Sequence, residues 1–201
     1  VWYAFFPELE GPHGPAHLLL QNPLHHPEGD VASHLAQVAG RARELGADPL
    51  GVWAAFLHDV GKPATAQPTP EGWYRFPGHD ALGAEMIPGI ARRFGWSRAW
   101  EEALVATTRL HMRVLRPATP RAVRRFQAEA GSYLSLLRLV CTADGEGRRE
   151  DLEAWFRVET PVEPLLRGRD LLALGFQPGP ELGRLLRRAY ELQLELGLKT
   201  K

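Results

Sequence analysis

Residues 49–63 read PLGVWAAFLHDVGKP and hold the most informative pattern of the chain. The apolar run predicts a helix over about 49–60, which Gly61 and Pro63 end. This helix carries His58 and Asp59 side by side at its carboxyl end. Adjacent helical side chains point about 100° apart, yet a pocket at a helix end can still accept both on one ion. The alternative is a helix-capping histidine beside a solvated aspartate.

Further helices are predicted on both sides of this stretch. Asp30 is a plausible N-cap for a helix over about 31–45 that ends at Gly46. No segment alternates like a strand over a useful length, so the predicted fold class is an all-α bundle. The other predicted helices cover about 79–94, 98–112, 119–130 and 132–144, and the tail 168–197 is predicted as a short helix, a Pro-Gly-Pro break and a second helix with Pro180 in its first turn. Residues 1–29 and 61–78 are predicted as loops, with a short apolar helix or turn at the start and a strand-like piece at 72–76.

Composition restricts the class of protein. The 201 residues include 24 Lys and Arg and 24 Asp and Glu, and 44% are hydrophobic, as in an ordinary globular domain. Zero net charge argues against a protein that coats nucleic acid or anionic membrane with its whole surface. The single cysteine, Cys141, excludes an internal disulfide and fits a reducing compartment. No apolar run approaches a membrane span and the first residues do not resemble a signal peptide, so we expect a cytoplasmic protein.

Two more residues strengthen the case for a metal site. His34 lies within the helix predicted over 31–45, between apolar neighbours, and Asp144 follows an apolar run. A carboxylate after such a run is costly to bury unless it is paired or bound to a metal. Together, His34, His58, Asp59 and Asp144 would form a mixed imidazole and carboxylate set from three helices. Such a set suits Mn, Fe, Zn, Co or Ni, and Mg less well.

The order of these residues resembles the HD superfamily of metal-dependent phosphohydrolases. With the surrounding motifs, the chain resembles the HD domain attached to bacterial tRNA nucleotidyltransferases (CCA-adding enzymes) and poly(A) polymerases. The motifs are PELEG at 7–11, QNP at 21–23, HHPEGDVxxH at 25–34, HDVGKP at 58–63, GHDxxGAE at 78–85, LHM at 110–112, ADxxGR at 143–148 and GRDLLxxGFxPGPExG at 168–183. The resemblance implies an HD-domain bundle with a lead-in loop over 1–160, and a C-terminal helical extension over 161–201 like the tRNA-side region of those enzymes.

The resemblance also implies a centre of one or two divalent ions, with Mn, Ni, Co, Fe, Zn and Mg as candidates. The first ion would be held by His34, His58, Asp59 and Asp144. The second would be held by His79 and His111, with Asp59 bridging the two ions. The alternative for His79 and His111 is that they cap helix ends and bind no metal.

Two cations are candidates for substrate binding. Lys62 lies just past the His58-Asp59 pair and offers a mobile charge to a phosphoryl oxygen, which would make it catalytic together with Asp59. Its alternative role is a cation favoured by the helix macrodipole. Arg148 matches a motif position of the family and could contact substrate, and its alternative is an ordinary surface arginine.

The implied activity is hydrolysis of phosphate esters of nucleotides or RNA ends, including 2′,3′-cyclic phosphates, without a covalent intermediate. Nucleotidyl transfer is not expected, because no Gly-Ser is followed by an Asp-x-Asp. The rival interpretation is a module that binds tRNA or other RNA and has a structural or vestigial metal site. The tail motif favours the rival, as do six arginines within 109–125, a stretch without acidic residues that can equally be a solvated face. The tryptophans are interpreted as core or loop anchors rather than as stacking platforms for bases.

Overall fold

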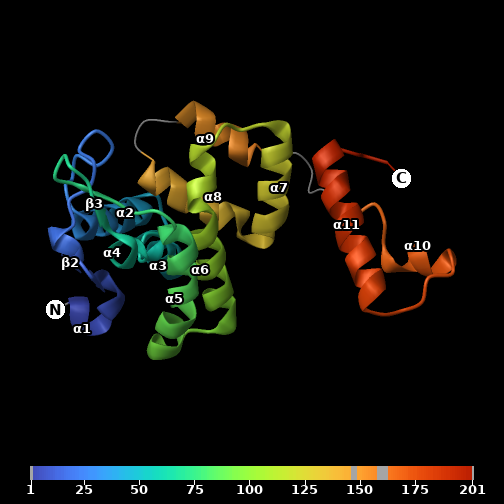
Figure 1. Cartoon of the computed structure of the whole chain (residues 1–201), viewed down its shortest axis with the longest axis horizontal. Coiled ribbons are helices and arrows are strands. Elements are labelled where there is room, and N and C mark those ends of the chain that lie inside the picture. The colour runs from blue at the N-terminus through green and yellow to red at the C-terminus, as the bar shows by residue number, and fades with distance from the viewer. Residues whose placement is uncertain (1, 146–148, 158–162, 201) are drawn as a thin grey trace.

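The computed structural model describes residues 2–145, 149–157 and 163–200 (Figure 1). This part is helical apart from very short strand pairs, which confirms the predicted all-α fold class. The bundle consists of α2 (Val31–Glu44), α3 (Pro49–Leu57), α4 (Lys62–Thr65), α5 (His79–Phe94), α6 (Arg98–Leu110), α7 (Pro120–Ala130), α8 (Leu134–Asp144) and α9 (Arg149–Phe156). Two short helices precede it, α1 (Trp2–Phe5) and the 3₁₀ helix η1 (Pro7–Leu9), and two helices follow it, α10 (Gly168–Ala173) and α11 (Pro180–Leu196).

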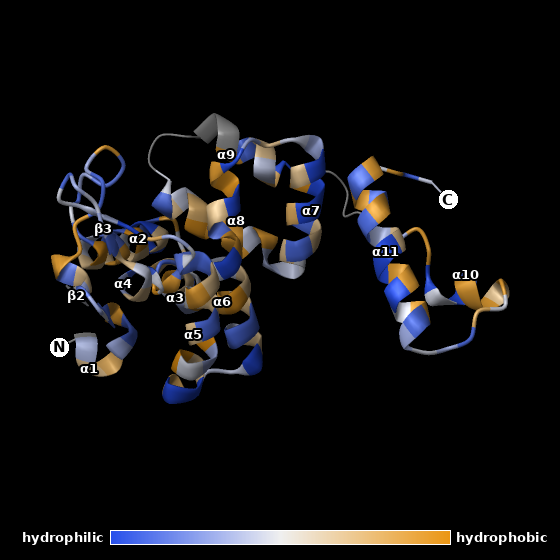
Figure 2. Cartoon of the chain, viewed as in Figure 1, coloured by the Kyte–Doolittle hydropathy of each residue, from blue (hydrophilic) through white to orange (hydrophobic). Residues whose placement is uncertain are grey.

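The main core lies between α2, α3, α5, α6 and α8. Helix α2 packs against α3 and α8, α5 packs along α6, and α3 contacts both α6 and α8. Leu35, Leu57 and Leu104 from three of these helices are fully buried. Complete burial of one such side chain contributes about 2 kcal/mol to the free energy of unfolding. The apolar inner faces of these helices therefore hold the bundle together (Figure 2).

A second, smaller core joins α7 and α9 to α8. The ring of Phe126 contacts Trp155 and Phe156 at centroid distances of 5.1 and 5.5 Å, and all three residues are buried. Helix α9 was not predicted from the sequence. Its two aromatic residues become part of a core only when α7, far away along the chain, packs over them.

Most predicted helix ends are confirmed. The Asp30 carboxylate accepts a hydrogen bond from the Ser33 amide at 2.9 Å and caps α2, and Pro180 lies in the first turn of α11. The largest shift is at α3, which ends at Leu57 rather than near residue 60. The next residues form tight turns, since Val60 N donates to Leu57 O and Lys62 N donates to Asp59 O. His58 and Asp59 therefore lie in a turn between two helices and not on a helix face.

Helix α6 ends earlier than predicted, and helix α8 begins later than predicted. Helix α6 ends at Leu110, and the 3₁₀ helix η3 (His111–Leu115) follows it, so that His111 is the first residue of η3. The 3₁₀ helix η4 (Gly131–Tyr133) precedes α8, which begins at Leu134.

The lead-in segment and the loop before α5 form one layer across an end of the bundle. Strands β1 (Glu10–Gly11) and β2 (Gly14–Pro15) pair antiparallel, followed by the 3₁₀ helix η2 (Ala16–Leu18). Strands β3 (Gln67–Pro68) and β4 (Tyr74–Arg75) form a second antiparallel pair. The Tyr74 amide donates to the Leu20 carbonyl at 2.8 Å, which ties this second hairpin to the lead-in segment.

The extension α10–α11 projects from the bundle and contacts it through α7 (Figure 1). The Arg124 guanidinium donates to the carbonyls of Leu194 and Glu195 near the end of α11, at 2.9 and 3.4 Å. Residues 158–162, which include the predicted boundary at 160, lie outside the described residues, so the division into two units stays a prediction. No helix in the described part combines the length and apolar character needed to cross a bilayer.

Candidate metal centre

Six side chains from five separate segments converge inside the bundle. His34 comes from α2, His58 and Asp59 from the turn after α3, and His79, His111 and Asp144 from the start of α5, the start of η3 and the end of α8. Five of them are buried, and the Asp144 side chain is 29% exposed. These are the six metal ligands that the resemblance implies, and the structure brings all of them together.

The two oxygens of Asp59 face two different groups of side chains. Its Oδ2 lies 3.3 Å from His34 Nε2 and 3.1 Å from His58 Nε2. Asp144 Oδ1 completes this group, at 3.2 Å from His34 Nε2 and 3.7 Å from His58 Nε2.

On the opposite side, Asp59 Oδ1 lies 2.9 Å from His79 Nε2 and 3.2 Å from His111 Nε2. The two Nε2 atoms are 3.4 Å apart. One carboxylate therefore separates a group of two imidazoles and a carboxylate from a group of two imidazoles.

All four histidines present the same nitrogen to Asp59. The Nδ1 atoms of His58, His79 and His111 each lie 2.7 Å from the carbonyl three residues earlier in the chain. A carbonyl oxygen can only accept, so each Nδ1 carries the proton and each neutral ring leaves its Nε2 lone pair free. Metal-binding histidines are oriented in this way, with one nitrogen donating to a backbone or carboxylate oxygen and the other ligating the ion.

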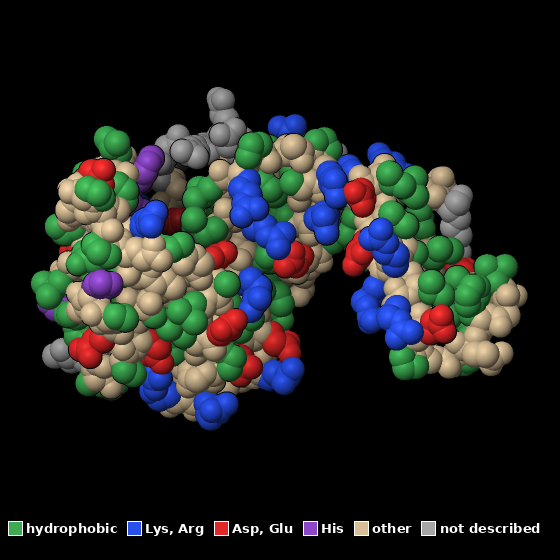
Figure 3. Space-filling view, viewed as in Figure 1, with side chains coloured by type: hydrophobic (Ala, Val, Ile, Leu, Met, Phe, Trp, Pro, Cys, Tyr) green, Lys and Arg blue, Asp and Glu red, His purple; other side chains and the backbone are tan. Residues whose placement is uncertain are grey.

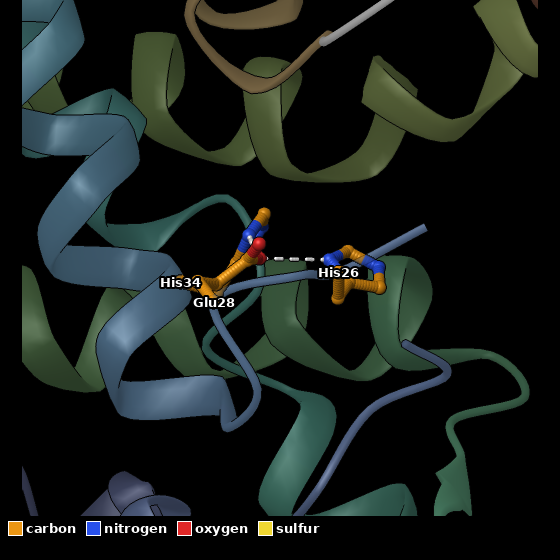
Figure 4. Close-up of side chains that lie close together, drawn as sticks. All are labelled: His26, Glu28 and His34. Atoms are coloured by element: carbon orange, nitrogen blue, oxygen red, sulfur yellow. Dashed lines mark hydrogen bonds and ion pairs between the residues drawn. The ribbon is translucent and has the colours of Figure 1, made fainter. Parts of the chain in front are cut away.

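Glu28 orients the fourth histidine, His34 (Figure 4). Its Oε1 lies 2.6 Å from His34 Nδ1 and 3.0 Å from His26 Nδ1. Burial raises the pKa of Glu28, but hydrogen bonds from a backbone amide and from His26 lower it by more than burial raises it. The pKa therefore lies below its usual value, and the carboxylate is ionised. Although these three side chains are close enough to hold an ion themselves, the shared Oε1 already accepts from both rings.

The charges of the cluster keep its carboxylates ionised. Burial raises the pKa of Asp59, but the neighbouring His58 imidazole and Lys62 ammonium hold it well below its usual value. Burial likewise opposes the protonated form of His34, yet the Asp144 and Asp59 carboxylates beside its Nε2 raise its pKa to about 9. The pKa of His111, in contrast, is lowered by burial.

The donor atoms fit a divalent ion. His34 Nε2, His58 Nε2 and Asp59 Oδ1 are buried and have no hydrogen-bond partner among the described residues. Buried polar atoms without partners are costly, and such atoms converging from imidazole and carboxylate are what a transition metal or Zn²⁺ binds. His34, His58 and Asp144 form one group within metal-ligand reach, and His58, Asp59 and His111 form another.

Lys62 points into the cluster rather than out to solvent. Its Nζ lies 2.6 Å from Asp59 Oδ2 and donates to Gln21 Oε1 at 2.7 Å, and the residue is buried. The Phe76 ring lies 5.5 Å from the same Nζ. An ammonium group has three protons, so two of these contacts leave one N–H available to another acceptor.

Two glycines allow the turn that carries His58 and Asp59 to approach α5. A Cβ at Gly61 would lie 2.2 Å from the His79 carbonyl oxygen and 2.7 Å from the Gly83 amide nitrogen. A Cβ at Gly83 would lie 3.0 Å from the Thr108 methyl group. The glycines in the HDVGKP and GHDxxGAE motifs are therefore needed for backbone contact, which brings His79 to Asp59.

A cavity of about 610 Å³ opens above the cluster. Asp59, Lys62, His79, His111 and Asp144 line its floor. Its walls come from the loop at 21–27, the segment at 73–76, η3 and α9. The cavity volume falls in the range of small-molecule sites, and the cluster is therefore accessible to a ligand from one side.

The remaining predicted residues are Arg148 and the arginines within 109–125. Arg148 lies outside the described residues. Of the arginines at 109–125, Arg113 pairs with Glu129 at 2.8 Å and Arg121 pairs with Glu195 at 2.6 Å, while Arg124 holds α11. Part of this basic stretch is therefore engaged in contacts within the chain.

Sequence reasoning missed the supporting roles of Glu28 and Gln21. Both residues stand in the motifs that were quoted, HHPEGDVxxH and QNP, but only as part of a resemblance. An acidic residue six positions before a candidate ligand histidine was the available signal for Glu28. Gln21 offered no signal, because its contact with Lys62 joins residues 41 positions apart.

The chain is similar in sequence to known proteins over most of its length. A family model described as HD domain matches residues 31–146. The chain is 36% identical over 160 residues to a CC-adding tRNA nucleotidyltransferase of Thermus thermophilus, covering 74% of this chain and 37% of that protein. It is 34% identical over 206 residues to an A-adding tRNA nucleotidyltransferase of Deinococcus radiodurans, covering 92% and 46%. It is 31% identical over 201 residues to a multifunctional CCA protein of Methylococcus capsulatus, covering 91% and 44%. The chain thus spans less than half the length of these relatives.

Proposed function

Because the chain belongs to the HD-domain family, we propose that it is a metal-dependent phosphohydrolase that acts on phosphate esters of nucleotides or RNA ends. The observation that carries this proposal is the arrangement of Asp59 between two groups of imidazoles, with Oδ2 toward His34 and His58 and Oδ1 toward His79 and His111. A purely structural histidine cluster does not require four imidazole Nε2 atoms directed at one carboxylate.

In this proposal, His34, His58, Asp59 and Asp144 hold one divalent ion, and Asp59, His79 and His111 hold a second. When bound, such ions lower the pKa of a coordinated water and neutralise charge on phosphoryl oxygens. The identity and number of the ions are part of the proposal. Nitrogen-rich ligation favours Mn, Fe, Co, Ni or Zn over Mg.

The protein side chains would bind and orient the phosphate. Lys62 reaches the floor of the cavity and has an N–H beyond its contacts with Asp59 and Gln21. That N–H would donate to a phosphoryl oxygen and stabilise the charge that grows on it during hydrolysis. Because Gln21 holds the ammonium group in place, this charge is positioned before substrate arrives.

The names of the relatives support the proposed substrate class. Their names describe enzymes that add nucleotides to tRNA. We propose nucleotide and RNA-end phosphates as substrates, with 2′,3′-cyclic phosphates as the first candidates, which would place the activity in the cytoplasm. The full sequence contains no Gly-Ser pair followed by an Asp-x-Asp motif. We therefore propose hydrolysis, and not nucleotide addition, for this chain.

The test combines metal analysis with an activity assay. The purified chain is loaded with Mn²⁺, desalted and analysed for bound metal, and hydrolysis of 2′,3′-cyclic AMP is measured before chelation, after chelation and after metal is restored. We expect up to two equivalents of metal and activity that disappears and returns with it. A folded chain that binds metal but hydrolyses neither this substrate nor simple phosphomonoesters would contradict the proposal.

The second candidate is an RNA-binding module whose metal site is structural. Arg184 and Arg187 on α11 are exposed and favour this candidate. Figure 3 shows Lys and Arg side chains on the surface of the projecting extension. Binding of tRNA at two salt concentrations distinguishes this candidate. Affinity that falls steeply with salt, in a chain without hydrolytic activity, would support it.

A further inference from the structure

The cavity above the metal ligands has an apolar wall that hydrolysis alone does not explain. Trp73, Tyr74 and Phe76 line it from the segment of strand β4, on the same side as Lys62. The Phe76 ring faces the Lys62 ammonium, and the Tyr74 ring contacts the His13 ring at 5.7 Å. Two of these three aromatic side chains therefore already have a partner.

Trp73 has none. Of the tryptophans whose side chains the structure describes, Trp53, Trp96, Trp100 and Trp155 each contact another aromatic ring. Among the same described residues, the Trp73 ring contacts no aromatic ring and its indole N–H makes no hydrogen bond. Its half-buried side chain lines the cavity instead.

The backbone around Trp73 is held in place. The Trp73 carbonyl accepts hydrogen bonds from the Thr69 amide at 2.9 Å and the Thr69 hydroxyl at 2.7 Å. The next amide, of Tyr74, donates to the Leu20 carbonyl at 2.8 Å. A ring on a fixed backbone loses less conformational entropy when it binds a ligand than a ring on a free loop.

Exposed leucines mark the mouth of the same cavity. Leu24 is 85% exposed and Leu115 is 52% exposed, and both line the cavity. They come from the lead-in segment and from η3. A polar floor beneath an apolar mouth fits a ligand with a charged end and a flat apolar end.

From these observations we infer that this wall is a nucleobase subsite, in which Trp73 stacks on the base of the nucleotide whose phosphate lies against Lys62 and the metal ligands. The inference rests on the proposed function for the position of the phosphate. Every base has a π-face, so stacking on one indole accepts all four bases. The cavity volume of about 610 Å³ admits a terminal nucleotide and is too small for a duplex. Trp73, which the sequence suggested was a loop anchor, is thereby given a binding role.

The test compares two substrates that differ only in the base. One is 2′,3′-cyclic AMP, and the other is the methyl riboside 2,3-cyclic phosphate, which has the same sugar and cyclic phosphate. For the Mn²⁺-loaded wild type we expect a higher kcat/KM with the nucleotide. Trp73→Ala should lower this value about 10-fold, mainly through KM, which is the size of effect seen when one stacked base loses its aromatic partner. The same variant should change hydrolysis of the methyl riboside much less.

Two further variants separate stacking from folding. Trp73→Phe keeps a ring and should retain most of the preference for the nucleotide. Arg75→Ala is the matched control, because Arg75 lies two residues after Trp73 but is exposed and donates a hydrogen bond to Gln67. A wild type that does not distinguish the two substrates would overturn the inference, as would a Trp73→Ala variant that loses equal activity on both.

An equilibrium measurement keeps this inference separate from the proposed function. Binding of 2′,3′-cyclic AMP is measured by calorimetry with metal-free wild type and metal-free Trp73→Ala. Weaker binding by the variant supports the subsite even if the chain hydrolyses nothing. Equal binding by the two proteins, or none by either, overturns it.

Discussion

The metal-ligand cluster buries charged side chains, whereas the extension α10–α11 exposes large apolar side chains. In the cluster, Asp59, His58 and Lys62 are buried, and the Asp59 carboxylate lies against the Lys62 ammonium and the His58 imidazole. In the extension, Leu174 is 74% exposed and Leu196 is 66% exposed, and its charges form short surface pairs such as Arg188 with Glu191.

The two regions differ in how much stability the loss of one charged side chain would cost. Surface ion pairs contribute little to stability and cost little to lose. Buried charges cost several kcal/mol each unless they are compensated, so the cluster persists only because five segments position its partners together. A single change should therefore have a much larger effect in the cluster than in the extension, and the following predictions test that contrast.

The largest effect is expected at Asp59. Asp59→Asn removes the charge between the two groups of imidazoles and should reduce hydrolysis of 2′,3′-cyclic AMP by about 10³-fold or more, the order associated with loss of a main electrostatic element. Bound metal should fall as well. Asp80→Asn is the control, because Asp80 lies on α5 next to His79 but outside the cluster. A folded Asp59→Asn variant with near wild-type activity would contradict the assignment of this residue.

Gly61 tests the backbone contact beneath the cluster. In Gly61→Ala, the added methyl group would overlap the His79 carbonyl oxygen, so we expect a loss of about 3 kcal/mol or more in the free energy of unfolding. Gly40→Ala, in the exposed middle of α2 where a Cβ meets no atom within 4 Å, should be neutral or slightly stabilising. Urea unfolding of both variants measures this, and equal stabilities would refute the close approach.

Metal binding should depend on pH through His34. Its pKa of about 9 in the metal-free protein means that the ring is protonated at pH 7 and must lose a proton to ligate an ion. Apparent metal affinity should therefore rise about tenfold per pH unit from pH 7 and level off near pH 9. The sign is the same for His79, whose pKa is also raised, chiefly by Asp59 acting against the effect of burial. Competition with a chromophoric chelator measures the affinity, and an affinity that falls over this range would be the opposite result.

Glu28 should affect the metal without touching it. Glu28→Ala removes the acceptor that orients His34 and should weaken metal binding by about 10- to 100-fold, as for other residues that orient metal ligands. Glu10→Ala serves as a control at an exposed position of the lead-in segment. Unchanged metal affinity in Glu28→Ala would mean that packing alone orients His34.

The smallest effect is expected at the junction with the extension. Arg124→Ala removes hydrogen bonds to the carbonyls near the end of α11 and should favour local detachment of the extension by about 1 kcal/mol. Limited proteolysis should then cut the extension faster, while hydrolysis of 2′,3′-cyclic AMP stays at the wild-type rate. Arg125→Ala, an exposed neighbour on the same helix, should be cut at the wild-type rate. Faster cutting of both variants alike would remove the special role of Arg124.

The sequence by itself determined the helical fold class and the residue types of the centre. Helix periodicity, caps such as Asp30 and breaks such as Gly61 depend on neighbours a few positions away, so local pattern suffices to predict them. The six candidate ligands were recognised through motifs whose order along the chain is itself the signal. Helix α9 escaped prediction because its aromatic residues, Trp155 and Phe156, are explained only by Phe126 on another helix.

The tertiary structure decided the directions of the side chains. Only the fold shows that the two oxygens of Asp59 face different groups, that Lys62 turns inward to Gln21, and that Trp73 has no aromatic partner among the described residues. Contacts between residues tens of positions apart along the chain set these directions. Their energies depend on burial and on distances of a few ångströms, which side-chain type and spacing in the sequence do not specify.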